Sequence, residues 1–171
     1  RKYTPERWED YAFSPGIRTE NTIRFSGGSD KTTFYSSFSY LDEKGYSIKS
    51  DFDRLSTRLN VAHEVAPWMD ANVNLSYSFS DSNSNGQSAD SGSVFWFVDN
   101  IPSIYPLFTR DADGNKIPEP IFGGYEYDYG FGAGAGRGFG ANTNAIADAH
   151  YNLNNSKRHD INTSASFIFK L

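Results

Sequence analysis

The stretch "DANVNLSYSFSDSN", residues 70–83, alternates apolar and polar side chains with a period of two. Its apolar positions are Val73, Leu75, Tyr77 and Phe79, and its polar positions are Asn72, Asn74, Ser76, Ser78 and Ser80. Because successive side chains of a β-strand point to opposite faces of the sheet, this pattern predicts a strand with one apolar and one polar face. The fold therefore depends on what lies against each of the two faces.

Four further segments repeat this alternation. In "DRLSTRLNVAHEV", for example, Leu55, Leu59 and Val61 oppose Arg54 and Arg58. Together the segments predict five strands, at residues 21–28, 31–41, 53–65, 70–82 and 159–170. Strands of about 9–13 residues are longer than the usual 5–6 of soluble sheets.

The connections between these strands alternate in length. Two are tight, "GSDK" at 28–31 and "APWMD" at 66–70, whereas "DEKGYSIKSD" at 42–51 and residues 83–156 are longer. In an antiparallel meander alternate connections lie on the same side, so short turns and long loops separate, as they do in transmembrane β-barrels. We therefore predict an all-β fold: an antiparallel meander forming part of a large transmembrane β-barrel, with long extracellular loops.

This prediction assigns an environment to each face of the sheet. The apolar row that includes Leu75 faces the hydrocarbon of a membrane, and the polar row faces a wet lumen. The residues predicted to form the lumen-facing wall are Arg54, Arg58, Asn74 and Ser76. Arg54 and Arg58 lie about 13 Å apart at the usual strand rise. They are either solvated wall charges or partners of acidic groups on a part of the protein outside this chain.

Composition excludes several other classes of protein. The chain has 171 residues, 37% of them hydrophobic, and the run "VFWFV" at 94–98 is far too short for a transmembrane helix of about 20 residues. A net charge of −5 without a basic block argues against a nucleic-acid partner. The absence of cysteine excludes a disulfide scaffold and a thiolate metal site.

Several motifs in combination resemble SusC/RagA-type TonB-dependent outer-membrane transporters. They are an S-G-G hairpin at Ser26, Gly27 and Gly28 with Lys31 and Tyr35, a strand end at Tyr40, Leu41 and Gly45, and a strand with Phe52, Arg54, Arg58 and Asn60. The loop "NIPSIYPLFTRDADGNKI", residues 100–117, is similar to the loop that follows in the same family. The resemblance covers roughly residues 8–117, and residues 118–155 match no family pattern.

The resemblance implies a location in the Gram-negative outer membrane and uptake of large nutrients, usually oligosaccharides and sometimes peptides. A SusD-like surface lipoprotein would act as a lid, and TonB-ExbB-ExbD would supply energy through a plug domain. No plug is recognisable here, and five strands are far fewer than the roughly 22 of such barrels. We therefore expect the chain to be a fragment of a larger transporter that cannot transport alone.

The segment "GGYEYDYGFGAGAGRGFG", residues 123–140, lies in the long loop 83–156. It lacks the G-K-[ST] signature of a phosphate-binding loop. One interpretation is a mobile loop with aromatic anchors. The other is that Tyr125, Tyr127 and Tyr129 contact the substrate or the lid, because amphipathic tyrosines are common at recognition surfaces.

The remaining motifs favour no enzymatic activity and no cofactor. "RDADGNKI", residues 110–117, departs from the EF-hand pattern and is more typical of a β-turn. A calcium site remains the alternative interpretation. The histidines form no H-E-x-x-H pair, and no G-x-S-x-G elbow occurs. A rival interpretation is a secreted carbohydrate-binding β-sandwich that uses the same tyrosines. A surface adhesin is a third, but it leaves the sorting of the loops unexplained.

Overall fold

The computed structural model describes residues 5–86, 92–131, 136–138 and 142–170. Its elements are α1 (Glu9–Ala12), β1 (Ile17–Gly28), β2 (Thr32–Lys44), β3 (Asp51–Ala66), β4 (Met69–Asn83), α2 (Val94–Asn100), α3 (Ala145–Tyr151) and β5 (Asn155–Phe169). They form two compact units. The sheet unit comprises residues 17–44, 51–83 and 155–171, and the loop unit comprises residues 1–16, 45–50 and 84–154.

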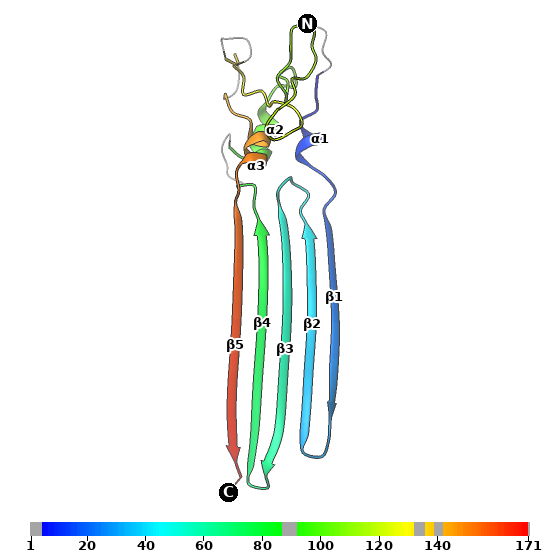
Figure 1. Ribbon diagram of the computed structural model, residues 1–171, viewed down its shortest axis with the longest axis vertical. Coiled ribbons are helices and arrows are strands. Elements are labelled where there is room, and N and C mark those ends of the chain that lie inside the picture. The colour runs from blue at the N-terminus through cyan, green and yellow to red at the C-terminus, as the bar shows by residue number, and fades with distance from the viewer. Residues whose placement is uncertain (1–4, 87–91, 132–135, 139–141, 171) are drawn as a thin grey trace. The chain divides into compact units, whose positions relative to one another are not determined.

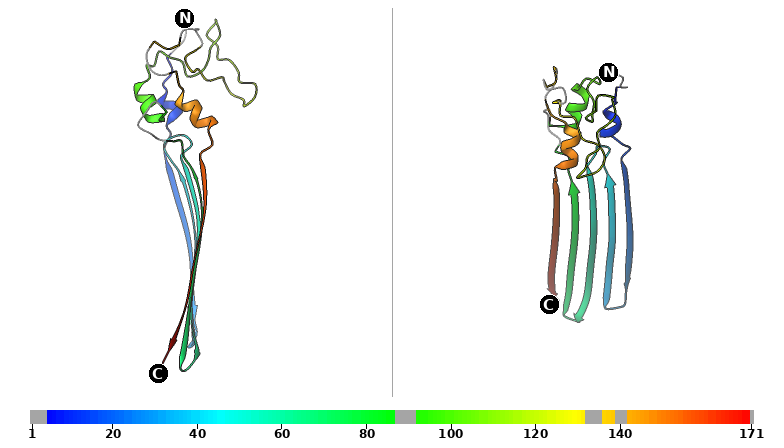
Figure 2. Two further views of the ribbon diagram at one scale, coloured as in Figure 1. Left: turned by 90° about the vertical axis from the view of Figure 1, so that its left-hand side faces the viewer. Right: turned by 45° about the horizontal axis from the view of Figure 1, so that its top comes forward.

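The sheet unit is a five-stranded meander in which each strand pairs antiparallel with the next in sequence (Figure 1). The strands have 12 to 16 residues, and the sheet twists along their length (Figure 2). A backbone hydrogen bond of 2.7 Å from Ser29 to Thr32 closes the first hairpin, and a bulge between Glu64 and Ala66 precedes the second. The predicted antiparallel all-β meander is confirmed.

Four strands begin earlier than the sequence pattern indicated, and the difference is largest, four residues, for β1 and β5. β1 starts at Ile17 rather than residue 21, and β5 starts at Asn155 rather than residue 159. The added segments "IRTE" and "NSKR" carry no apolar alternation, yet their backbones stay paired, with Ile17 opposite Lys44 and Asn155 opposite Asn83. Pairing therefore continues beyond the apolar part of the sheet.

The register brings the apolar positions of all five strands onto one face. One row across the sheet consists of Ile23, Phe38, Thr57, Tyr77 and Ile161. These side chains are poorly covered, since Ile23 is 56% and Ile161 is 69% exposed. Leu41 is the one buried hydrophobic residue among the described residues of the sheet unit. A sheet with a continuous, uncovered apolar face is poorly suited to water.

The loop unit has a hydrophobic core of its own, although the sequence pattern indicated only a long loop. Its buried residues are Trp8, Ala12, Val94, Phe97, Val98, Leu107, Phe108, Ala145, Ile146 and Ala149. The "VFWFV" run forms most of α2, and Phe97 packs edge-on against Trp8 with ring centroids 5.0 Å apart. Asn144 caps α3 by accepting a 3.1 Å hydrogen bond from the Ala147 amide. Among the described residues, no helix has the length and apolarity needed to cross a membrane.

Candidate functional site

The face of the sheet opposite the apolar one carries hydroxyl, amide and guanidinium groups, and we call it the polar wall. Two neighbouring rows of this wall are Arg24, Ser37, Arg58, Ser76 and Asn162, and Ser26, Tyr35, Asn60, Asn74 and Ser164. The register thus puts the sequence-predicted Arg54, Arg58, Asn74 and Ser76 on one face. Arg24 belongs to the same row as Arg58, and the alternation of "NTIRFSGG" already carried the signal for it.

Side chains of the polar wall hydrogen-bond across the strands. The Thr22 and Ser39 hydroxyls lie 3.0 Å apart, and Ser39 donates to Glu20 at 3.3 Å. Asn74 donates to the Ser164 hydroxyl at 3.2 Å. The hydroxyl and amide side chains of this wall can act both as hydrogen-bond donors and as acceptors.

Of the two arginines on β3, Arg54 makes an ion pair within the sheet, whereas no ion pair of Arg58 is found among the described residues. The Arg54 guanidinium is 3.8 Å from Glu20, which is itself 3.8 Å from Arg18. Arg54 therefore has an acidic partner within the sheet. Because both side chains of the pair are solvent-exposed, the pair contributes little to stability.

A shallow hollow of about 220 Å³ lies on the sheet unit beside the row of Arg58. Its lining residues are Thr33, Phe34, Tyr35, Asn60, Val61, Ala62, Asn72 and Asn74. A phenol and three amides are therefore concentrated at one point of an otherwise hydroxyl-rich face.

The structure brings two of the three predicted tyrosines together around Phe108. Tyr125 is 45% exposed, with its ring centroid 5.7 Å from that of Phe108. Tyr127 is half-buried between Phe108, at 5.1 Å, and His150, at 6.0 Å. Burial raises the pKa of Tyr127. Tyr125 is thus the more accessible of these two rings.

The third tyrosine, Tyr129, is held by helix α3. Its hydroxyl donates a 3.0 Å hydrogen bond to Asp148. Burial, and then this hydrogen bond, raise the pKa of Tyr129 far above its ordinary value. Substrate or lid contact by the three tyrosines stays a prediction, with Tyr125 the best placed for it.

A second feature, which the sequence reasoning missed, surrounds Lys116. Its ammonium lies 4.5 Å from the ring centroid of Phe108, 5.3 Å from that of Tyr125 and 3.1 Å from Glu6. Burial opposes the charge, but hydrogen bonds to Glu6 and Tyr11 prevail and raise the pKa of Lys116. Glu6 is far from Lys116 in sequence, so no local spacing signals this contact.

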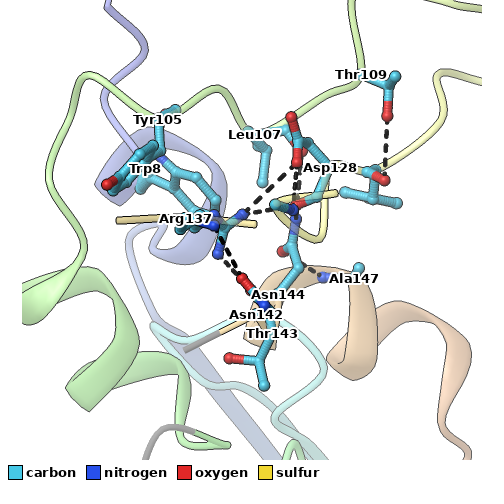
Figure 3. Close-up of polar contacts among 12 residues, drawn as sticks. Trp8, Tyr105, Leu107, Thr109, Asp128, Arg137, Asn142, Thr143, Asn144 and Ala147 are labelled. Atoms are coloured by element: carbon cyan, nitrogen blue, oxygen red, sulfur yellow. Dashed lines mark hydrogen bonds and ion pairs between the residues drawn. The ribbon is translucent and has the colours of Figure 1, made fainter. Parts of the chain in front are cut away.

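Arg137 organises the described part of the glycine-rich segment (Figure 3). Its guanidinium donates to the backbone carbonyls of Thr143 at 2.6 Å and Asp128 at 2.7 Å, and its side chain is only 1% exposed. It also lies 5.8 Å from the ring centroid of Trp8. Burial lowers the pKa of Arg137. Residues 132–135 and 139–140 of this segment, and residue 141 directly after it, lie outside the described residues.

The "DADGN" segment forms the predicted turn. The Asp111 carboxylate accepts hydrogen bonds from the amides of Asn115 at 2.8 Å and Asp113 at 2.9 Å, and Gly114 has a φ of 91°. The hydrogen bonds from Asn115, and then those from Asp113 and Gly114, lower the pKa of Asp111. Within the described ranges no group of three or more His, Cys, Asp or Glu side chains is placed to hold a metal ion.

Comparisons with known proteins identify relatives that match parts of this chain. No family model matches the chain. TonB-dependent receptor P3 of Formosa agariphila is 28% identical over 68 residues, which cover 40% of this chain and 7% of that receptor. TonB-dependent receptor P39 of the same organism is 27% identical over 105 residues, covering 61% of this chain and 9% of that receptor.

Solved structures match almost the whole chain. A chain in the structure of the RagAB peptide transporter has a TM-score of 0.67 and 23% identity, covering 98% of this chain and 18% of that one. A chain of the RagAB peptide importer in its closed-closed state has a TM-score of 0.62 and 22% identity, with 98% and 17% covered. The fold is therefore that of a segment of a much longer chain, and the resemblance inferred from the motifs is confirmed.

Proposed function

We propose that this chain, which resembles a stretch of SusC/RagA-type TonB-dependent transporters, is a wall segment of an outer-membrane importer in a Gram-negative cell. One observation carries the proposal: five paired strands present a continuous exposed apolar face and, on the other side, a polar wall. A transmembrane barrel has this arrangement because lipid covers its outer face and water fills its lumen. A β-sandwich would instead bury its apolar face against a second sheet.

The height of the apolar face supports the proposal. On β4 it extends from Met69 to Phe79, a distance of about 33 Å at the usual rise per residue. Strands tilted by about 40° would span about 25 Å of membrane over that length, which matches the apolar band of such barrels. The next row contains Asp42, Asp53, Asp81 and Lys157, so charge begins where the band ends.

Aromatic residues at both ends of this face add to the argument. Trp68 stacks on Phe169 at 6.1 Å at the end with the tight turns, and Phe79 contacts His159 at 4.7 Å at the other end. Aromatic girdles mark both interfaces of transmembrane barrels. The end with the tight turns would face the periplasm, and the loop unit, whose segments join β2 to β3 and β4 to β5, would be extracellular.

The imported solute would be a large oligomer. The resemblance favours oligosaccharides. Peptides are the second candidate, because the solved structures with this fold are a peptide transporter and a peptide importer. The polar wall suits both classes, since its hydroxyls and amides bind sugar hydroxyls and peptide groups equally well.

We infer that the loop unit contributes to capture, together with a SusD-like surface lipoprotein acting as a lid. The exposed ring of Tyr125 supports this role, with Tyr127 and Tyr129 in supporting positions. After capture, TonB-ExbB-ExbD would act through a plug domain elsewhere in the protein. The solute would then pass along the polar wall.

Uptake by cells that express the full-length protein tests the proposal. Labelled oligosaccharides and labelled peptides of similar size would be supplied to cells with and without TonB. We expect one class to accumulate only when TonB is present, and the protein to sediment with the outer membrane. TonB-independent accumulation, or a protein that is soluble without detergent, would refute the proposal and favour the secreted β-sandwich.

A further inference from the structure

The charges of the polar wall are almost all paired with one another. Its acidic side chains in the strands are Glu20, Glu43, Glu64, Asp70 and Asp160. Each lies within ion-pair distance of a cation: Arg54 or Arg18 for Glu20, Arg18 for Glu43, Lys170 for Glu64 and Asp70, and Arg158 for Asp160. The acids of the wall are therefore neutralised by neighbours.

Arg24 and Arg58 are the exceptions. Among residues 5–86, 92–131, 136–138 and 142–170, neither makes an ion pair or a side-chain hydrogen bond. Both side chains are exposed and both lie in one row, in which Arg24 pairs with Ser37 and Ser37 pairs with Arg58. Two strand spacings separate them by about 10 Å. The wall thus carries two neighbouring positive charges without a counter-ion from the described chain.

We propose that Arg24 and Arg58 form an anion-binding row that binds carboxylate groups of the imported solute. The inference rests on the proposed function and specifies the chemistry of its substrate. A guanidinium binds a carboxylate through two parallel hydrogen bonds, which an amide or a hydroxyl cannot do. In the described ranges no serine beside these arginines accepts a side-chain hydrogen bond from them, so both guanidinium groups can bind a ligand.

The next row of the polar wall provides uncharged groups beside the two arginines. Tyr35, Asn60 and Asn74 follow directly along the strands and line the 220 Å³ hollow. They would bind neutral hydroxyl or amide groups of the same solute. A spacing of about 10 Å fits carboxylates three residues apart in a polyproline II peptide, which has three residues per turn and therefore presents them on the same side about 9 Å apart. It is also within reach of the carboxylates along a uronic-acid oligosaccharide, because arginine side chains are long and flexible.

The electrostatic potential of the polar wall also favours an anionic ligand. Opposite charges within the wall cancel at Arg54 and Arg158, so the uncompensated potential is concentrated at Arg24 and Arg58. In a narrow lumen with low-dielectric walls such a potential raises the local concentration of anions. Added salt should therefore weaken the capture of an acidic solute.

Binding to the purified full-length transporter in detergent tests the row. The probes are a short oligogalacturonate with its methyl ester, and a peptide with two glutamates three residues apart with its glutamine analogue. We expect the Arg24→Gln/Arg58→Gln variant to bind the matching carboxylated probe about fivefold more weakly, since each exposed pair contributes modestly. Binding of the neutral partner should not change.

A charge-matched control removes two paired cations from the same wall, Arg18→Gln/Arg158→Gln, and should change binding less than twofold. Three results would overturn the row: no effect of the arginine variant, an equal loss for charged and neutral probes, or a lower melting temperature of the solute-free protein with unchanged binding. The last result would mean that the arginines pair with acidic groups of the same protein. If no probe were taken up in a TonB-dependent way, the proposed function would be rejected. Direct binding to the purified protein would still show whether Arg24 and Arg58 bind carboxylates.

Discussion

Leu59 of β3 lies directly opposite Leu75 of β4, and the two side chains remain 38% and 40% exposed. Two leucines that face each other in the middle of a sheet usually lie under a second layer. Here the next row continues the apolar face from Phe38 to Ile161, and both of these side chains are exposed as well. The pair therefore places the proposed lipid contact in the centre of the sheet, where it is easiest to test.

We expect Leu75→Arg to block assembly and Ser76→Arg to be tolerated in the full-length protein. The two positions are adjacent but point to opposite faces. An arginine on the lipid face near the midplane costs about 2–4 kcal/mol, whereas a lumen position should cost little. Folding into lipid vesicles measures the difference, and equal tolerance of both variants would show that the face assignment is wrong.

Tyr125 and Tyr127 should respond differently to replacement by alanine. Tyr127 is packed between Phe108 and His150, so its loss should destabilise the loop unit by about 2 kcal/mol. Tyr125 is more exposed, and its loss should weaken solute capture or lid closure with a stability change below about 1 kcal/mol. Binding and chemical denaturation of each variant separate the two effects. Unchanged capture by Tyr125→Ala would remove the recognition role.

Arg137→Met should destabilise the loop unit by about 1–3 kcal/mol, because it removes the guanidinium donor from the part-buried carbonyls of Thr143 and Asp128, of which only the Asp128 carbonyl keeps a second donor, the Asn144 amide. Arg137→Lys should restore only part of the loss, since one ammonium cannot reproduce the planar fork. Hydrogen exchange in the loop unit measures both variants. Exchange in β2 to β4 serves as the control and should not change.

The loop unit should lose stability as the pH falls below about 6.5. Burial, and then the charge of Lys49, lower the pKa of His150 from its ordinary value of 6.5. Because the folded state binds the proton less tightly than the unfolded state, stability is complete above 6.5 and is lost as the pH falls toward the folded-state pKa. Denaturation at pH 7.5 and 5 would measure the loss, followed by the fluorescence of Trp8 in a variant whose Trp68 and Trp96 are replaced by phenylalanine.

His150→Phe should flatten this pH dependence, because no titrating group would remain at that position. His159→Phe is the matched control, since His159 belongs to the sheet unit. A pH dependence that persists in His150→Phe would assign the effect to another group.

The sheet was predictable from the sequence because its signal is local. Alternation marks each strand, and the tight turn after Gly28 sets the register that puts Glu20 within reach of Arg54. The strand ends at residues 17–20 and 155–158 were missed because they lie beyond the apolar band and carry no alternation of apolar and polar side chains.

The loop unit was not predictable in the same way. Its core joins Trp8 to Phe97 and its polar network joins Glu6 to Lys116, contacts that span most of the chain. No period of 2 or 3.6 residues encodes such contacts. The three tyrosines were recognisable as a group, but only the fold distinguishes the exposed Tyr125 from Tyr129, which is tied to Asp148.

Pairing between consecutive strands has a consequence for the order of assembly. β1 to β4 can form as two successive hairpins with short closures, whereas β5 must find β4 across residues 84–154. The entropic cost of closing a loop grows with its length. A 2.9 Å hydrogen bond from the Ser84 amide to the Asn154 carbonyl joins the two ends of that segment. Once the loop unit has folded, the effective loop is therefore a few residues long. We expect the pairing of β5 with β4 to be the slow step of folding. Its rate should be limited by formation of the loop-unit core around Phe97 and not by pairing of the strands.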